Sequence, residues 1–408
     1  MDARAILEEE ARRSFRFFYE EANTDLKSSG YGLIRDKTSE IAKDVASIAS
    51  VGFGLSAFVI GVERGWISYE EAYDRVKGTL HSFYHNVEHA NGFFYHFVNM
   101  NTGKRNQHFH DCASIIDTSI FLNGALTAAS YFGGDIEVYF QKIYQRVDWE
   151  KYYNREGNVY YMGYHEETGG FGRWDMYAEQ MMQYFLGVAS PTHSVPTIIY
   201  EGFERRLLTY KTYTFYNSPG GALFTHQFSH AWFDFRSYLD PDGIDWFENS
   251  IVASTASRAF SIDRKDNFKT YRKNAWGLTA CEGPNGYIVP GTPPYYDEVK
   301  MQLDGTVPPC GAIGSIVFTP EAVKEAVHYY YHQHPNLFGK YGFFDAYNED
   351  VDPTWYADIV IGIDKGISLL MIDNYLHGTT WKYYMQHPLI NKAIDRLGFK
   401  KKEVRVES

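Results

Sequence analysis

The sequence predicts an all-α fold in which an inner and an outer ring of helices form an α/α toroid. Helical periodicity runs from one end of the 408 residues to the other. The predicted helices 113–131 and 355–376 are apolar nearly all round, whereas 68–85 is amphipathic, as an inner and an outer ring require. No linker or charge block divides the chain, so we predict one domain over residues 1–408.

The first predicted helix shows the pattern on which the others are based. Ile6, Ala11, Phe15, Phe18 and Tyr19 follow one face of a helix that runs through about residue 22. A stack of helical repeats is the competing architecture, but the sequence shows no fixed-period repeat. The remaining helices are predicted at 45–63, 68–85, 113–131, 135–147, 173–188, 194–207, 227–237, 244–262, 308–316, 320–333, 355–376 and 380–396.

Three connectors between these helices are rich in glycine and aromatic residues. They cover 91–97, 158–171 and 282–296, and we expect them to be long loops with a few short strands. Loops of this length in a compact domain are usually functional. In a toroid they would gather at the rims.

The composition points to a neutral or weakly polar partner. With 51 acidic and 39 basic residues and a net charge of -12, the chain has no surface suited to phosphates, which excludes nucleic acid and anionic membranes as partners. Aromatic residues make up 17% of the chain, and flat rings with polar neighbours suit the faces of sugars. The alternative is that these rings simply fill the core.

The ends and cysteines of the chain carry no targeting or cross-linking pattern. No apolar run is long enough to span a membrane, and the N-terminal residues lack a signal pattern. As written, the chain is expected in the cytoplasm, or in the periplasm or outside the cell if a signal segment was removed. Cys112, Cys281 and Cys310 are interpreted as buried thiols, and the oligomeric state stays open.

Three carboxylates are candidates for catalysis. Asp117 is flanked by aliphatic residues on a helix predicted to be buried, where a charge is costly without a partner or a task. Asp364 has similar neighbours, although it could instead be the N-cap of the helix that follows. Glu179 lies on a mixed face of the helix predicted at 173–188, so a solvated glutamate is its alternative interpretation. Paired acids of this kind serve glycoside hydrolysis, in which one donates a proton and the other activates water or attacks carbon.

His226, His230 and Asp234 lie at four-residue steps, a spacing that can bind a metal. The glutamate of the HExxH pattern is missing, so we favour a polar network or helix packing and predict no metal.

Six short motifs follow one another between about Gly32 and Phe399: Ser114 to Thr118, Trp174-x-x-Tyr-x-Glu179 with Ser190 to His193, Leu223 to Trp232, Trp276 to Ala280, Asp304 to Pro309, and Gly362 to Gly366. Together they resemble the glycoamylase-like family, which includes endo-β-1,2-glucanases of glycoside hydrolase family 144.

This resemblance implies an (α/α)6 toroid that hydrolyses β-1,2-glucan or sophoro-oligosaccharides with inversion and without a cofactor. By matching motif, Glu179 is the expected general acid, Asp364 activates water, and Asp117 is a further essential carboxylate. Lys365 follows Asp364 where we expect Gln, which would alter the local hydrogen bonding.

The predicted substrate is an oligo- or polysaccharide bound by aromatic and polar side chains. The sugar-facing rings are expected to be Tyr164, Phe171, Trp174, Tyr216, Trp276 and Tyr287, and the hydroxyl partners Arg173, His165, Gln227 and His230. The alternatives are hydrolysis or transglycosylation of another β-glucoside, a non-catalytic glycan-binding protein, or a lyase or epimerase on the same toroid.

Overall fold

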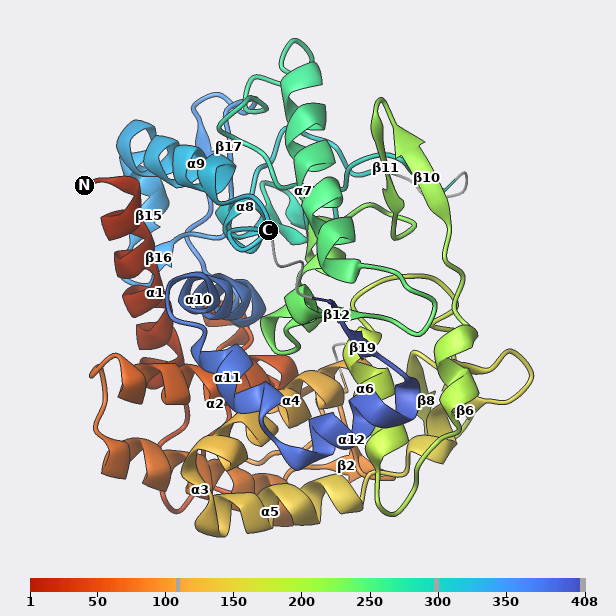
Figure 1. Cartoon of the computed structure of the whole chain (residues 1–408). Helices are drawn as coiled ribbons and strands as arrows, with labels where there is room; N and C mark the ends of the chain where they lie inside the picture. Colours follow the sequence, from red (N-terminus) through yellow and green to blue (C-terminus); the bar gives the residue numbers. More distant parts are fainter. Residues whose placement is uncertain (108–110, 297–300, 404–408) are drawn as a thin grey trace.

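Two sets of α-helices differ in burial and alternate along the chain (Figure 1). The computed structural model describes residues 1–107, 111–296 and 301–403. Nearly every residue is buried in the inner helices α2 (Ile48–Glu63), α4 (Ile115–Phe132), α6 (Met181–Ala189), α8 (Pro309–Ile313) and α10 (Gly362–Leu376). One face is buried in the outer helices α1 (Ala3–Glu20), α3 (Tyr69–His85), α5 (Gly134–Gln145), α7 (Trp246–Asp263) and α9 (Pro320–Gln333).

The inner helices contact one another around the ring, α2 with α4 and α10, α4 with α6, and α8 with α10. One hydrophobic core extends from Ile6 to Phe399. These contacts confirm the predicted α/α toroid. Its fourth pair consists of short 3-10 turns, with η3 (Thr197–Glu201) outside and η4 (Leu223–His226) and η5 (Phe228–Ala231) inside.

Two further helices cover one end of the ring. α11 (Thr379–Met385) contacts α2, α4 and α10, and α12 (Pro388–Leu397) packs on α6, as Figure 1 shows. Arg396 of α12 donates to the carbonyl of Val188, near the end of α6. Helices α11 and α12 therefore cover the toroid at the C-terminal ends of the inner helices. The loops that precede the inner helices lie at the opposite, open end.

Several predicted helices are shorter than expected. The helix predicted at 173–188 begins at Met181. Within the helix predicted at 308–316, only α8 (Pro309–Ile313) is helical. The helices predicted at 194–207 and 227–237 are 3-10 turns. In 355–376 the helix begins at Gly362 because residues 355 and 356 pair as a strand, and 380–396 is divided before Pro388, which cannot continue a helix.

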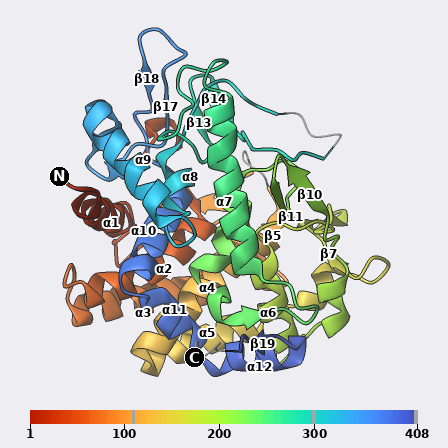
Figure 2. The ribbon, with the colours of Figure 1, turned by 45° about the horizontal axis from the view of Figure 1, so that its top comes forward.

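Short antiparallel strands occupy the predicted aromatic connectors and other loops. The hairpins β13–β14 and β17–β18 lie at the same end of the molecule, at the top of Figure 2. The strands are β1 (Val45–Ser47), β2 (His89–Ala90), β3 (Phe93–Phe94), β4 (Phe97–Asn99), β5 (Ala113–Ser114), β6 (Tyr153–Asn154), β7 (Val159–Tyr160), β8 (Gly163–His165), β9 (Gly169–Phe171), β10 (Leu207–Tyr210), β11 (Tyr213–Tyr216), β12 (Tyr238–Leu239), β13 (Cys281–Gly283), β14 (Gly286–Ile288), β15 (Phe338–Gly339), β16 (Gly342–Phe343), β17 (Tyr347–Asn348), β18 (Trp355–Tyr356) and β19 (Lys400–Lys401).

No helix in the part of the chain that the structure describes is both long and apolar enough to cross a bilayer. Cys281 and Cys310 are buried free thiols, as predicted, whereas Cys112 is only half-buried.

Candidate active site

The three predicted carboxylates lie where inner helices begin. Asp117 is in the first turn of α4, Asp364 is in the first turn of α10, and Glu179 lies two residues before α6. A helix N-terminus carries a partial positive charge that stabilises nearby anions. The helix N-termini at the open end of the toroid therefore offset part of the electrostatic repulsion between carboxylates that lie close together.

Glu179 is not on a helix, in contrast to the prediction. It lies in the turn before α6, where its backbone carbonyl accepts a hydrogen bond from Ser229 Oγ at 2.7 Å. The same hydroxyl accepts the backbone N–H of Met182 at 3.2 Å, so η5 holds this turn against α6. Burial, with a smaller contribution from the charge of Asp117, raises the pKa of Glu179 to about 7. A carboxyl group that is still partly protonated near neutral pH can act as a general acid.

Asp117 is fixed by the loop in front of α4. Ser114 caps this helix, and its Oγ lies 2.5 Å from Asp117 Oδ2. His96 Nε2 lies 3.5 Å from the other carboxylate oxygen. Only 6% of Asp117 is exposed, so these two side chains account for how a buried carboxylate is accommodated here.

Asp364 is not the N-cap of α10, because that position is taken by Ile361. It is buried and hydrogen-bonded to Asp345, which lies between β16 and β17. Burial, followed by the charge of Asp345 and the hydrogen bond to it, holds the pKa of Asp364 well above its usual value. The thiol of Cys310 in α8 opposes this shift by hydrogen-bonding to Asp364.

Two acids in this group were missed by sequence reasoning. Asp345 stands alone between Phe344 and Ala346, and this isolated charge in an apolar run was the available signal. Asp36 precedes Lys37, and its backbone carbonyl accepts the N–H of Gly362 at 2.7 Å. Burial raises the pKa of Asp36 to about 6, with smaller contributions from Asp117 and Asp345. Electrostatic coupling thus connects Glu179, Asp117, Asp36, Asp345 and Asp364 into one carboxylate cluster.

Lys365, the departure from the expected motif, makes its hydrogen bonds outside the carboxylate cluster. Its Nζ lies 2.6 Å from Glu10 Oε1 in α1 and also donates to the carbonyls of Tyr341 and Phe343. Lys365 therefore connects α10 to the outer ring and donates no hydrogen bond to Asp364.

Among the predicted aromatic residues, Tyr287 lies within electrostatic range of Asp364. It lies on β14, and Glu282 on the paired strand donates its backbone N–H to Asp345 Oδ2 at 2.7 Å. Tyr287 is 51% exposed, so part of it is accessible from solvent. Surrounding protein, followed by the charges of Asp364 and Asp345, holds the pKa of Tyr287 well above its usual value.

A second aromatic group lies beside Asp117. Strand β5, which leads into α4, pairs with β8 through Ala113 and Tyr164, and β8 pairs with β9. His165 and Phe171 are stacked on this sheet with ring centroids 4.6 Å apart. Phe171 is 41% exposed, so this stack offers an open ring surface at the same end of the toroid.

The other predicted binding residues lie mostly in packing contacts. Trp276 is fully buried, and 7% of Trp174 is exposed. Gln227 donates to the carbonyl of Gly311 and to Ser315, His230 contacts Ser250, Tyr216 packs on Trp246, and exposed Arg173 lies 3.5 Å from Glu156.

Within the described residues, no group of three or more His, Cys, Asp or Glu side chains is arranged to hold a metal. Burial lowers the pKa of His226 and of His230 to about 3, so both rings are neutral. Their Nε2 atoms pair with Asn217 and Ser250, so each ring belongs to a local polar network.

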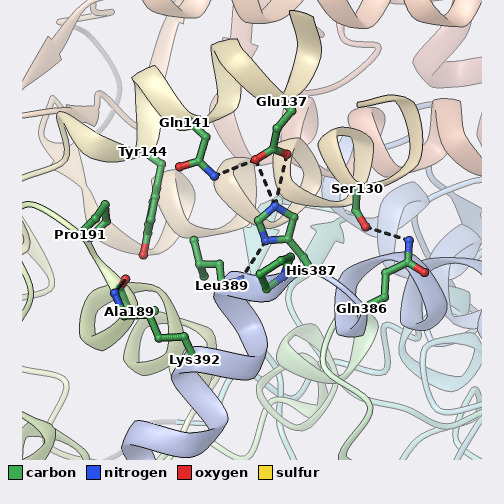
Figure 3. A pocket seen from close by; sticks show the side chains of 11 residues that line it. Ser130, Glu137, Gln141, Tyr144, Ala189, Pro191, Gln386, His387, Leu389 and Lys392 are labelled. Atoms are coloured by element: carbon green, nitrogen blue, oxygen red, sulfur yellow. Dashed lines mark hydrogen bonds and ion pairs between the residues drawn. The ribbon is translucent and has the colours of Figure 1, made fainter. Parts of the chain in front are cut away.

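A separate hollow of about 740 Å³ lies between α5, α6 and α12 (Figure 3). The carboxylate in its lining is Glu137, whose Oε2 lies 3.2 Å from His387 Nε2. Gln141 donates a hydrogen bond to the same carboxylate. None of the carboxylate cluster lines it, and it lies at the closed end of the toroid. We therefore place the candidate active site at the carboxylate cluster rather than in this larger hollow.

Comparison with known proteins agrees with this fold. The family model described as "Glycoamylase: Putative glucoamylase" matches residues 172–388. An exo beta-1,2-glucooligosaccharide sophorohydrolase (non-reducing end) of Parabacteroides distasonis is 27% identical over 429 residues, which cover 94% of this chain and 56% of that protein. This chain thus matches little more than half the length of that relative.

Two solved structures resemble the whole chain. One, described as a "putative glucoamylase" from Bacteroides uniformis, has a TM-score of 0.87 and 27% identity and covers 98% of each chain. The other is an endo-beta-1,2-glucanase from Chitinophaga pinensis in complex with sophorotriose and glucose. Its TM-score is 0.86 at 26% identity, with 98% of this chain and 99% of that chain covered.

Proposed function

Since the chain belongs to the glycoamylase family, we propose that it is a glycoside hydrolase that cleaves β-1,2-glucan or sophoro-oligosaccharides. The observation that carries this proposal is the carboxylate cluster, in which Glu179 has a pKa of about 7 and lies near other carboxylates at the open end of the toroid. Glycoside hydrolysis needs both a protonated and an ionised carboxyl group. Two relatives named for β-1,2-linked glucans supply the linkage.

In the proposed reaction, Glu179 donates its proton to the glycosidic oxygen as the bond from that oxygen to C1 breaks. Asp364 removes a proton from the water that attacks C1 from the opposite face, and the anomeric configuration is inverted. Asp117 keeps the pKa of Glu179 high through its charge. Tyr287, Phe171, His165 and Tyr164 form the sugar-facing walls.

The test is incubation with linear β-1,2-glucan, laminarin, cellulose and starch, followed by chromatography of the products. We expect turnover of β-1,2-glucan only. Sophorose as the sole early product indicates exo cleavage, whereas a ladder of oligosaccharides indicates endo cleavage. Turnover of another glucan alone would overturn the linkage, and absence of turnover with retained binding would favour a glycan-binding protein. Proton NMR of the first-formed anomer tests inversion.

A further inference from the structure

Asp345 and Asp364 form a buried carboxyl pair whose electrostatics conflict with a simple role for Asp364. Exposure is 4% for Asp345 and 6% for Asp364, and the two side chains are hydrogen-bonded to each other. A base must be ionised, yet burial beside another carboxylate favours the protonated form. To act as a base, Asp364 therefore needs neighbouring groups that stabilise a negative charge in this buried position.

The surroundings of the pair favour a proton between the two groups. Asp345 Oδ1 and Asp364 Oδ2 are both buried, and neither accepts a hydrogen bond from a donor in the part of the chain that the structure describes. Two ionised carboxylates have only acceptors and cannot bond to each other. One shared proton satisfies both oxygens and leaves a single negative charge on the pair.

That single charge is stabilised whichever carboxyl group holds the proton. The backbone N–H of Glu282 donates to Asp345 Oδ2 at 2.7 Å, and the thiol of Cys310 donates to Asp364. Behind the pair is a cavity of about 10 Å³, which Lys365 and Glu10 also line. Because Lys365 is bound to Glu10 and two carbonyls, its ammonium group is already fully engaged and does not replace the shared proton.

We propose that Asp345 is a positioning residue that shares one proton with Asp364, so that the pair acts as the water-activating base. This inference rests on the proposed function. A water proton passes to Asp364 while the shared proton lies on Asp345, and the water oxygen bonds to C1. The glycosidic oxygen leaves with the proton of Glu179. The pair then holds two protons, and one returns through solvent to Glu179.

The variant Asp345→Asn tests the shared proton without changing the shape of the side chain. The amide can donate to Asp364 and accept from Glu282, so Asp364 loses a negative neighbour and gains a fixed donor. Both changes favour its ionised form, and we expect the acidic limb of kcat/KM to move to lower pH. A weaker base reacts more slowly, so kcat should fall about tenfold or more while KM stays within about twofold.

The other titratable groups around the pair are unchanged in this variant, and Asp358→Asn is the matched control. Asp358 is an exposed aspartate in the same segment between β18 and α10, and its replacement should leave the pH profile in place. The groups that face the pair are Cys310 of α8, Cys281 and Glu282 of β13, Tyr287 of β14, Lys365 of α10, and Asp36.

Infrared spectroscopy provides a readout that does not need activity. At neutral pH, the wild-type minus Asp345→Asn difference spectrum should contain the band of a protonated carboxyl group, and the Asp358→Asn difference should not. Absence of that band, or a drop in kcat with the acidic limb unmoved, would overturn the shared proton. If the band is present but no β-1,2-glucan is cleaved, the proposed function fails and the carboxyl pair remains established.

Discussion

Lys365 of α10 and Glu10 of α1 form an ion pair with 2.6 Å between Nζ and Oε1, and their side chains are 4% and 1% exposed. Glu10 also accepts the backbone N–H of Phe343 and the hydroxyl of Ser14. The pair therefore joins an inner helix, an outer helix and strand β16 directly behind the carboxylate cluster.

Removal of one partner of this pair should destabilise the protein strongly. Lys365→Met leaves the Glu10 carboxylate buried without its cation, which we expect to lower the free energy of unfolding by about 3–5 kcal/mol. Urea unfolding followed by circular dichroism measures the change. Glu8→Gln, which removes the exposed pair with Arg4, is the control and should cost about 0.3–0.5 kcal/mol. Equal losses in both variants would show that burial does not strengthen the Lys365 pair.

Glu179→Gln should abolish most turnover while the fold stays intact. The amide keeps the shape of the side chain but cannot donate an acid proton, so we expect kcat to fall by about 10²–10⁴ with an unchanged melting temperature. Glu201→Gln, at an exposed glutamate of η3, is the control. Reducing-end assays on β-1,2-glucan measure both rates. A Glu179→Gln enzyme with near-normal kcat would remove Glu179 from the mechanism.

The pH profile should have its alkaline limb near neutrality. Glu179 must be protonated to act, and its pKa is about 7, so kcat/KM should decrease about tenfold per pH unit above that value. The Asp117 charge raises the pKa of Glu179, so Asp117→Asn should move this limb to lower pH. The position of the limb is the readout, measured independently of the overall rate. A shift to higher pH would contradict the electrostatic role of Asp117.

Loss of the Tyr287 ring should weaken substrate binding. Tyr287→Ala removes the exposed ring next to Asp364, and we expect KM for β-1,2-glucan to rise about tenfold, which corresponds to about 1.4 kcal/mol. Tyr69 on α3 is also exposed, at 44%, but lies on an outer helix, so Tyr69→Ala should leave KM unchanged. An equal effect of the two substitutions would mean that Tyr287 does not contact the sugar.

His230 should make the fold sensitive to acid. Its pKa is about 3 in the folded protein and 6.5 ordinarily, so the unfolded chain binds the extra proton between these values. Stability is therefore complete above pH 6.5 and is lost as pH falls toward 3, by about 1.4 kcal/mol per pH unit for this group. His230→Gln should reduce that slope in urea unfolding at several pH values. An unchanged slope would show that His230 is protonated in the folded state.

The sequence predicted the toroid correctly because helical periodicity and the contrast between all-apolar and amphipathic segments are local signals. It placed the start of the predicted helix that contains Glu179 at residue 173, whereas α6 begins at Met181, because the backbone hydrogen bond of Trp174 to Tyr160 and the bridge between Met176 and Glu204 are long-range. Asp117 and Asp364 stood out as acids in apolar runs. Asp345, the partner of Asp364, was overlooked, since nothing local indicates that the β16–β17 loop reaches the start of α10.

The two ends of the toroid have separate tasks. Helices α11 and α12 close one end by packing on the inner ring, whereas short hairpins such as β8–β9 and β13–β14 surround the carboxylate cluster at the other. Exposed positions of those hairpins, such as Phe171 and Tyr287, lie outside the contacts between the helices. The scaffold is therefore suited to loop grafting, in which substrate preference is redesigned at one end while the melting temperature is set at the other.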